Sequence, residues 1–317
     1  MPYDADIIDP QLAAFGENVA TGLSRRPKKL SPRWLYDDRG CDLFEQITRL
    51  PEYYPTRTET GILSDNAQEI ADFCGTDAVM LEYGAGAGIK TEIILDALDK
   101  PCRYVPIDIA ANFLRQTAAR FERLYPGLAT TPVVGDFTAE IQLPASLPAA
   151  NRFGFFSGST IGNLDVEEAI AFLLQLRRHV GPSGKCLIGV DLKKDVPTLI
   201  DAYDDGQGVT AEFNLNLLRR INRELDGSFA LDQFHHRAVW NAAESAIEMH
   251  LVSKTRQTVR AAGQLFEFAE GETIHTESSR KYDYRSFAAL AANADWRLDR
   301  VWTDEEEKFA IFGLTPN

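Results

Sequence analysis

Short apolar runs alternate with longer segments of helical period through the middle of the chain. Each run has about the length of a strand and is apolar on both faces, as expected for strands buried on both sides of a sheet. The runs are AVMLEYG (78–84), CRYVPID (102–108), TTPVVGD (130–136), RFGFFSG (152–158) and KCLIGVD (185–191). Helical segments at 90–98, 109–124 and 165–180 separate them, and an apolar stripe predicts a further helix over 58–73. The pattern predicts a parallel sheet covered by helices on both faces, with ligands at the carboxyl ends of its strands.

The alternation stops after Asp191. Residues 193–281 combine polar, helix-prone segments with alternating stretches that are typical of antiparallel strands, and we interpret this block as an insertion. Beyond it the pattern predicts a helix over 285–294 and two strands, 296–304 and 308–316, joined by a short acidic turn. A parallel sheet closed by such a hairpin predicts the seven-stranded methyltransferase variant of the doubly wound, Rossmann-like α/β fold.

Composition narrows the classes of function. The 317 residues, 44% hydrophobic and 25% charged, fit a folded protein of one large domain or two interleaved ones. A net charge of −14 disfavours nucleic acid or an anionic membrane as partner, because such binding needs clustered Lys and Arg. No apolar run approaches the roughly 20 residues of a spanning helix, and the start MPYDADIIDPQLAAFGE lacks signal-peptide features, so we expect a cytoplasmic protein. Cys41, Cys74, Cys102 and Cys186 lack metal-site spacing, so we expect reduced thiols and no metal.

A glycine-rich turn, EYGAGAG (82–88), follows the first strand and precedes a helix, a context in which glycines let the backbone approach a ligand. It matches a dinucleotide fingerprint only in part, because the last glycine would fall on Ile89. Asp108 ends the second strand, where a carboxylate can accept hydrogen bonds from ribose hydroxyls. These features predict a nucleotide-bearing ligand at this edge of the sheet.

The third strand closes on Gly135-Asp136-Phe137, which offers a carboxylate and an aromatic face to an adenine ring. This arrangement favours a methyl donor over a nicotinamide. Lys90, in the first turn of the helix after the glycine-rich turn, can neutralise the carboxylate of S-adenosylmethionine. The sequence therefore predicts S-adenosylmethionine as the cofactor.

Long segments outside the sheet resemble a known family, the histidine-specific Nα-methyltransferases of ergothioneine biosynthesis. These segments are WLYDDRGCDLFEQITRLPEYYPTRT (34–58), SGSTIGN (157–163), AYDDGQGVTAEFN (202–214), IEM (247–249) and TESSRKY (276–282). The resemblance covers nearly the whole chain. It implies three successive transfers of methyl from S-adenosylmethionine to the α-amine of L-histidine, giving Nα,Nα,Nα-trimethylhistidine (hercynine).

The resemblance also implies two discontinuous domains. Residues 1–57 and 193–281 would form an α+β substrate-binding domain, and residues 58–192 and 282–317 the S-adenosylmethionine-binding methyltransferase domain. The partner is a small amino-acid substrate, and we expect a monomer with neither a nucleic-acid nor a membrane partner.

Carried over motif by motif, the resemblance implies a set of site residues. With Gly86 of the turn, the residues that hold the donor would be Gly84, Lys90, Asp108, Asp136 and Phe137. The catalytic residues around the amine would be Tyr36, Phe44 and Gly158. The substrate-binding residues would be Asn163 and Tyr203 for the carboxylate, Tyr53, Glu277 and Ser279 for the imidazole, and Met249 in the pocket wall.

These roles have a physical rationale. Asn163 and Tyr203 offer neutral donors, which bind a carboxylate without adding charge beside a sulfonium. Glu277 can accept an imidazole N–H. Tyr36 and Phe44 offer π-faces to an amine that becomes a trimethylammonium, an attraction of about 0.5 to 2 kcal/mol. The amine must lose a proton, and the Tyr36 hydroxyl or a water molecule can take it.

Three alternatives remain open. The same chemistry on tryptophan or tyrosine is the nearest, although Glu277 with Met249 favours an imidazole. A non-catalytic protein that binds S-adenosylmethionine or histidine is the second. A nicotinamide dehydrogenase is the third, and Ile89, the Gly-Asp-Phe motif and the terminal hairpin weigh against it.

Overall fold

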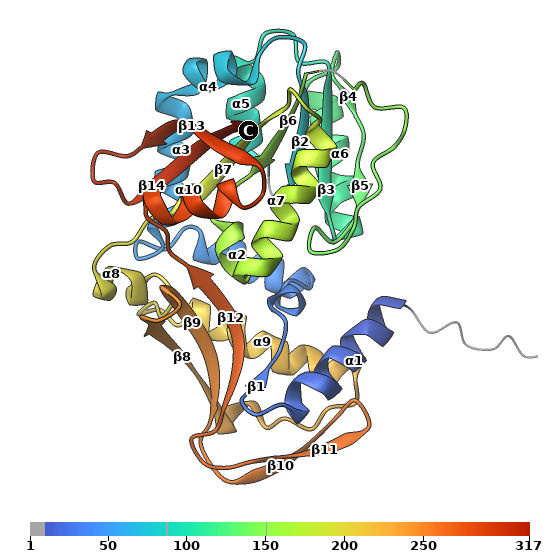
Figure 1. Ribbon diagram of the computed structural model, residues 1–317. Helices are drawn as coiled ribbons and strands as arrows, with labels where there is room; N and C mark the ends of the chain where they lie inside the picture. The colour runs from blue at the N-terminus through green and yellow to red at the C-terminus, as the bar shows by residue number, and fades with distance from the viewer. Residues whose placement is uncertain (1–9, 87, 150) are drawn as a thin grey trace, which may run out of the picture. The chain divides into compact units, whose positions relative to one another are not determined.

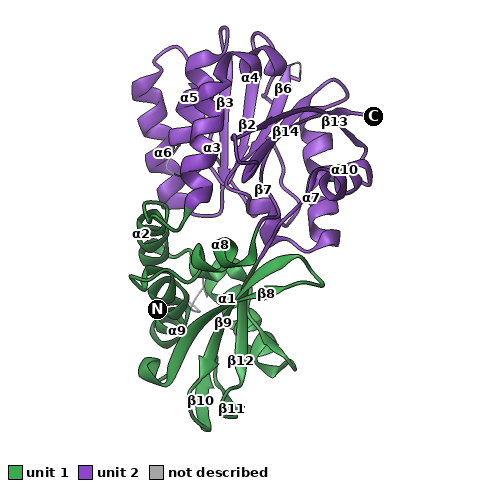
Figure 2. Cartoon of the chain, turned by 90° about the vertical axis from the view of Figure 1, so that its left-hand side faces the viewer, with its two compact units in different colours: residues 1–53, 195–278 green, residues 54–194, 279–317 purple. Residues whose placement is uncertain are grey.

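The computed structural model describes residues 10–86, 88–149 and 151–317, so Ala87 of the glycine-rich turn and the start of the chain lie outside the described residues. The chain divides into two compact units (Figure 1; Figure 2). Unit 1 is Met1–Tyr53 with Asp195–Ser278, and unit 2 is Tyr54–Lys194 with Ser279–Asn317. The boundaries predicted from the sequence lie at residues 57, 193 and 281. The assignment of one unit to the substrate and of the other to the donor stays a prediction.

Unit 2 is built on one mixed sheet. Within the described residues its strand order is β13-β14-β7-β6-β2-β3-β4, and β5 also pairs with β3. The strands are β2 (Val79–Tyr83), β3 (Arg103–Asp108), β4 (Ala129–Thr130), β5 (Val133–Val134), β6 (Arg152–Phe156), β7 (Lys185–Asp191), β13 (Trp296–Thr303) and β14 (Phe309–Pro316). Strands β2 to β7 pair in parallel, whereas β14 runs antiparallel to both β7 and β13. The predicted Rossmann-like α/β fold with a closing hairpin is confirmed.

Both faces of this sheet are buried, since alternate residues of β2 enter different clusters. Val79, Leu81 and Tyr83 pack with α7 (Val166–Val180) and α10 (Tyr284–Ala292). Met80 packs on the other side, in a cluster that draws on four helices: α3 (Tyr54–Asp65), α4 (Ala67–Cys74), α5 (Ile89–Ala97) and α6 (Ala111–Leu124). Figure 1 shows these helices in two layers around the strands. Such two-sided burial explains why the strands are continuously apolar.

Two sequence predictions in unit 2 were wrong in detail. The helix expected over 58–73 is two helices, because the side chain of Asn66 donates to the carbonyl of Ile62 at 2.8 Å and its backbone leaves the helical region. The strand expected over 130–136 is reduced to β4 and β5, because Pro132 between them has no N–H to donate to a ladder.

Unit 1 combines a sheet of order β1-β12-β9-β8 with the hairpin β10-β11, as seen within the described part of the chain. The strands are β1 (Lys28–Lys29), β8 (Phe234–Asn241), β9 (Ala246–Ser253), β10 (Gln257–Ala261), β11 (Gln264–Phe268) and β12 (Thr273–Arg280), which runs on into unit 2. The helices are α1 (Pro10–Ser24), α2 (Asp38–Ile47), α8 (Val196–Asp201) and α9 (Val209–Glu224), with a short turn of helix, η1, at Pro32–Leu35. β8 and β9 are antiparallel, as the alternating pattern predicts. Among the described residues, no helix has the length and apolarity needed to span a bilayer.

Candidate active site

The glycine-rich turn links β2 to α5 in unit 2. Gly86 and Gly88 have φ of +48° and +74°, a region that side chains rarely adopt, and a Cβ on Gly88 would collide with the ring of Phe121. Gly84 N–H donates to the carbonyl of Ile107 at 2.8 Å, which fixes the turn to the end of β3. Gly84, Gly86 and Gly88 therefore present main chain, rather than side chains, at the carboxyl edge of the sheet.

Asp108 lies against this turn. Its carboxylate accepts from the N–H of Ala110 at 2.9 Å and faces the N–H groups of Gly86 and Ile109. Burial raises the pKa of Asp108, and these hydrogen bonds only partly offset that effect. The structure thus brings the predicted residues Gly86 and Asp108 together.

The loop after β5 carries the other predicted adenine contacts. Gly135 N–H donates to the carbonyl of Asp108 at 3.1 Å, so the loop begins beside the end of β3. Asp136 turns back onto Thr138, accepting from its N–H at 2.9 Å and its hydroxyl at 2.6 Å. The Phe137 ring packs on Phe156, with centroids 5.2 Å apart. Phe137 is therefore anchored in the core, and its predicted contact with adenine stays a prediction.

Lys90 and Gly158 lie close together in unit 2. A Cβ on Gly158 would lie 3.8 Å from Lys90 Nζ. Both contact the carboxylate of Glu59, a fully buried residue of α3: Lys90 forms an ion pair with it, and Gly158 N–H donates to it at 2.8 Å and 3.1 Å. Glu59 was not among the site residues predicted from the sequence. The sequence feature that could have identified it is its spacing. Glu59 precedes the apolar Ile62 by three residues and Leu63 by four, which places this acid on the buried face of a predicted helix.

Glu82, the last residue but one of β2, is a second buried acid. It accepts from the hydroxyl of Thr91 at 2.7 Å and 2.8 Å and from the hydroxyl of Tyr104. These hydrogen bonds join β2 to α5, which follows the glycine-rich turn, and to the neighbouring strand β3. Burial raises the pKa of Glu82 to about 7, despite the hydrogen bonds from Tyr104 and Thr91.

The raised pKa of Glu82 predicts a stability that depends on pH. An acid whose pKa is about 7 when folded and 4.5 when unfolded holds more protons in the folded state between these values, so stability falls as pH rises through them. Relative to Glu82→Gln, the unfolding free energy of the wild type should fall by about 2 to 3 kcal/mol from pH 5 to pH 8. Urea denaturation of both proteins across this range measures the difference, and parallel curves would contradict the assignment.

Four predicted residues of unit 1 form a connected row of rings. The centroid of Tyr36, at the end of η1, lies 5.6 Å from that of Phe44 on α2. The Phe44 centroid lies 6.1 Å from that of Tyr53, which lies 6.0 Å from that of Tyr203. Phe213 of α9 was not predicted from the sequence, and its ring centroid lies 5.4 Å from that of Tyr36 and 6.1 Å from that of Phe44. All the contacts are edge-on or tilted, an arrangement that aromatic pairs favour.

Glu277 lies near this row. Burial raises the pKa of Tyr36 well above its usual value, and the charge of Glu277 is the next largest cause, followed by Tyr53 and Tyr203. Tyr36 is consequently a neutral hydroxyl at physiological pH and not a phenolate. The expectation that the Tyr36 hydroxyl or a water molecule takes the amine proton stays a prediction.

The end of β12 carries the remaining polar residues. Glu277 and Ser279 are two positions apart on one strand, so their side chains share a face. Ser279 Oγ accepts from the ammonium of Lys281 at 2.8 Å, in unit 2. The turn before Asn163 packs on this segment, because a Cβ on Gly162 would lie 2.7 Å from the carbonyl oxygen of Arg280. Asn163 and Ser279 therefore belong to touching segments of backbone.

Two further residues of unit 1, Met249 and His236, form hydrogen bonds that join its elements. Met249 is buried on β9, and its carbonyl accepts from the hydroxyl of Thr276 at 3.0 Å. His236, which was not predicted from the sequence to belong to the site, lies 2.8 Å through Nε2 from the carbonyl of Tyr203 and 2.9 Å through Nδ1 from Asn214. Burial lowers the pKa of His236, so it is neutral and braces Tyr203 by hydrogen bonding.

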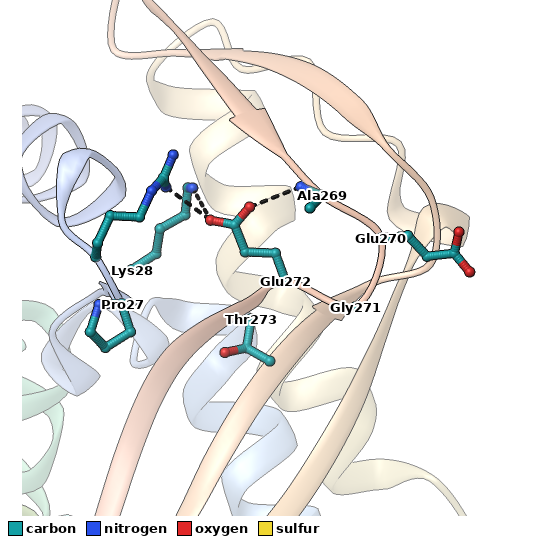
Figure 3. A pocket seen from close by; sticks show the side chains of 8 residues that line it. Pro27, Lys28, Ala269, Glu270, Gly271, Glu272 and Thr273 are labelled. Carbon is teal, nitrogen blue, oxygen red and sulfur yellow. Dashed lines mark hydrogen bonds and ion pairs between the residues drawn. The ribbon is translucent and has the colours of Figure 1, made fainter.

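A surface cavity of about 560 Å³ lies elsewhere in unit 1 and contains none of the predicted residues. It is lined by Arg26–Lys28 and Ala269–Thr273. The Glu272 carboxylate accepts from Arg26, Lys28 and the N–H of Ala269, and the contacts with Lys28 and Ala269 can be followed in Figure 3. Arg26 and Lys28 both form ion pairs with Glu272. This cavity is a feature of the outer end of the sheet, separate from the aromatic row.

Known proteins resemble this chain over nearly its whole length. The profile of the family described as histidine-specific methyltransferase, SAM-dependent, matches residues 15–316. A histidine N-alpha-methyltransferase of Mycolicibacterium smegmatis is 42% identical, over 96% of this chain and 95% of that protein. One of Mycobacterium tuberculosis is 43% identical, over 94% of each chain. A 4-dimethylallyltryptophan N-methyltransferase of Claviceps purpurea is 27% identical, also over 94% of each. The chain therefore belongs to the S-adenosylmethionine-dependent histidine-specific methyltransferase family.

Proposed function

We propose that this chain transfers three methyl groups from S-adenosylmethionine to the α-amine of L-histidine, which is the first step of ergothioneine biosynthesis. The observation that carries the proposal is the row of four rings beside Glu277, in a chain that matches the family over 15–316. The relatives that are 42% and 43% identical over nearly their full length support it.

The residues of unit 2 fit a nucleotide-bearing donor. The turn at Gly84 and Gly86 offers main-chain groups, Asp108 offers a carboxylate for ribose hydroxyls, and Lys90 offers a cation for the donor's carboxylate. When bound, S-adenosylmethionine supplies a methyl group on a positively charged sulfur. What these residues contribute is position, because holding reactants in a near-attack geometry supplies about 7 to 11 kcal/mol.

The residues of unit 1 fit the amino acid. Within unit 1, Tyr203 offers a hydroxyl donor for the carboxylate and Glu277 an acceptor for an imidazole N–H. The roles of Asn163 and Ser279, which belong to unit 2, are those that the family resemblance implies. The ammonium of Lys281 can only donate, so Ser279 Oγ is the acceptor of that hydrogen bond. By residue type, a hydroxyl and a carboxylate suit the two different nitrogens of a neutral imidazole.

The amine needs to be neutral before each transfer. An α-amino group has a pKa of about 8 in model peptides and is mostly protonated at pH 7. The neutral Tyr36 hydroxyl accepts a hydrogen bond from the amine and so orients its lone pair, while the proton leaves to water. Three protons are released as the ammonium of histidine becomes a trimethylammonium, whose fixed charge the faces of Tyr36 and Phe44 stabilise.

A substrate screen tests the proposal. The purified protein is incubated with S-adenosylmethionine and each of the twenty amino acids, and mass spectrometry identifies the products. We expect histidine to gain three methyl groups, with tryptophan and tyrosine unchanged. Methylation of tryptophan in place of histidine would favour the alternative suggested by the 27% identical relative, and binding without any product would favour a non-catalytic protein.

A further inference from the structure

We propose that Glu59 is the positioning residue of the donor site: its buried carboxylate holds the Lys90 ammonium where the carboxylate of S-adenosylmethionine binds. This inference rests on the proposed role of Lys90. Glu59 has an exposed fraction of 0%, so it acts through Lys90 and the Gly158 N–H rather than by meeting the donor itself.

Lys90 needs such a partner because of where it lies. It is the second residue of α5, and the N-terminal end of a helix carries partial positive charge that repels a cation. The side chain of a lysine is also long and flexible, with a strongly hydrated ammonium that solvent attracts. Without a fixed anion, Lys90 would turn away into water. Glu59 supplies that anion from α3, a separate element of unit 2.

The surroundings of Glu59 hold its carboxylate in one place. Gly158 N–H donates to both of its oxygens, at 3.1 Å and 2.8 Å. Gly189 of β7 also lies against this carboxylate, because any Cβ there would collide with Glu59 Oε1. One carboxylate therefore joins the first turn of α5, which meets the donor, to the loop after β6, whose Gly158 is predicted to lie beside the amine.

Replacement by glutamine separates the two contacts. The amide oxygen of Glu59→Gln still accepts from the Gly158 N–H, whereas its NH₂ group cannot attract the Lys90 ammonium. Gly61→Ala is the matched control, because Gly61 lies on the same helix and a Cβ there meets no atom within 4 Å. Lys90→Met removes the ammonium itself.

The test uses calorimetry with two probes, S-adenosylhomocysteine and 5′-methylthioadenosine, which shares the nucleoside but lacks the amino-acid carboxylate. We expect Glu59→Gln and Lys90→Met each to weaken S-adenosylhomocysteine binding by about tenfold or more. Binding of 5′-methylthioadenosine should change by less than about twofold in both. The double variant should bind S-adenosylhomocysteine only slightly more weakly than either single variant, because the two substitutions remove the same interaction.

Other outcomes overturn the inference in distinguishable ways. Equal losses for both probes in Glu59→Gln would make Glu59 a structural residue only. Unchanged or tighter S-adenosylhomocysteine binding in Glu59→Gln, with Lys90→Met still weakened, would refute positioning by Glu59 and leave the donor site as proposed. Undiminished binding in Lys90→Met would instead refute the proposed role of Lys90, and the role of Glu59 with it.

Discussion

Replacing Glu277 with alanine is expected to raise the KM for histidine by about 10- to 100-fold, the range for losing a hydrogen bond to a charged group. The KM for S-adenosylmethionine should stay within about twofold, because Asp108, Lys90 and the glycine-rich turn do not depend on Glu277. The expected increase is specific to histidine, because the N–H of its imidazole would lose a buried carboxylate acceptor that lies near Tyr36 in unit 1. Steady-state kinetics with each substrate varied in turn measure both constants.

Two variants sharpen this prediction. Glu270→Ala removes an exposed acid in the same unit and should leave both constants unchanged. Glu277→Gln keeps an oxygen that can accept a hydrogen bond from the imidazole, so its KM for histidine should rise less than that of the alanine variant. Equal increases in the two KM values would show that Glu277 does not recognise the imidazole.

Replacing Asp191 with alanine is expected to destabilise the fold by about 3 to 5 kcal/mol, the cost of leaving buried charges without their partner. The fully buried carboxylate of Asp191 pairs with Lys281 at 2.7 Å and Lys194 at 2.6 Å, and it accepts from the hydroxyl of Tyr54 at 2.7 Å. Without it two ammonium groups lie buried together. Denaturation in urea at pH 7 measures the loss.

The control for Asp191 is an exposed pair of similar length. Lys308 and Glu306 lie 2.8 Å apart at the surface, so Glu306→Ala should cost less than about 1 kcal/mol. Burial alone would raise the pKa of Asp191, but the two lysines hold it below 3.8. Its contribution is therefore complete above that pH and is lost as pH falls below it. A loss from Asp191→Ala as small as that from Glu306→Ala would contradict the assignment.

The strands that the sequence predicted best are those buried on both faces. A continuous apolar run such as 152–158 is too short for a typical helix and too apolar for a surface loop, so a buried strand fits it best. The third strand was predicted less well. Its apolar residues Val133 and Val134 suit a strand, but the effect of Pro132 depends on which neighbour would have received the missing hydrogen bond. Asn66 divides a helix by a local hydrogen bond that competes with a regular pattern.

The candidate site, like the fold, was predicted only in part from the sequence. Tyr36, Phe44, Tyr53 and Tyr203 were named from their resemblance to the family, and the structure places their rings in contact. Glu59 was missed because its partners come from α5 and from the loop after β6, far along the chain. A sequence shows which residues carry charge, but pairing between distant elements is set by the tertiary fold.

The pairing of β14 with β7 has a consequence for how the chain folds. Phe309 lies opposite Asp191, so the sheet of unit 2 is complete only after the whole intervening segment has been synthesised. Until then β7 presents an open edge, which is prone to pair with other chains. The entropy of closing a loop grows only slowly with its length, so an insertion as long as 195–278 adds little to the cost of closure. The insertion can therefore change in sequence, provided that β14 still pairs with β7 before the exposed edge pairs with a strand of another chain.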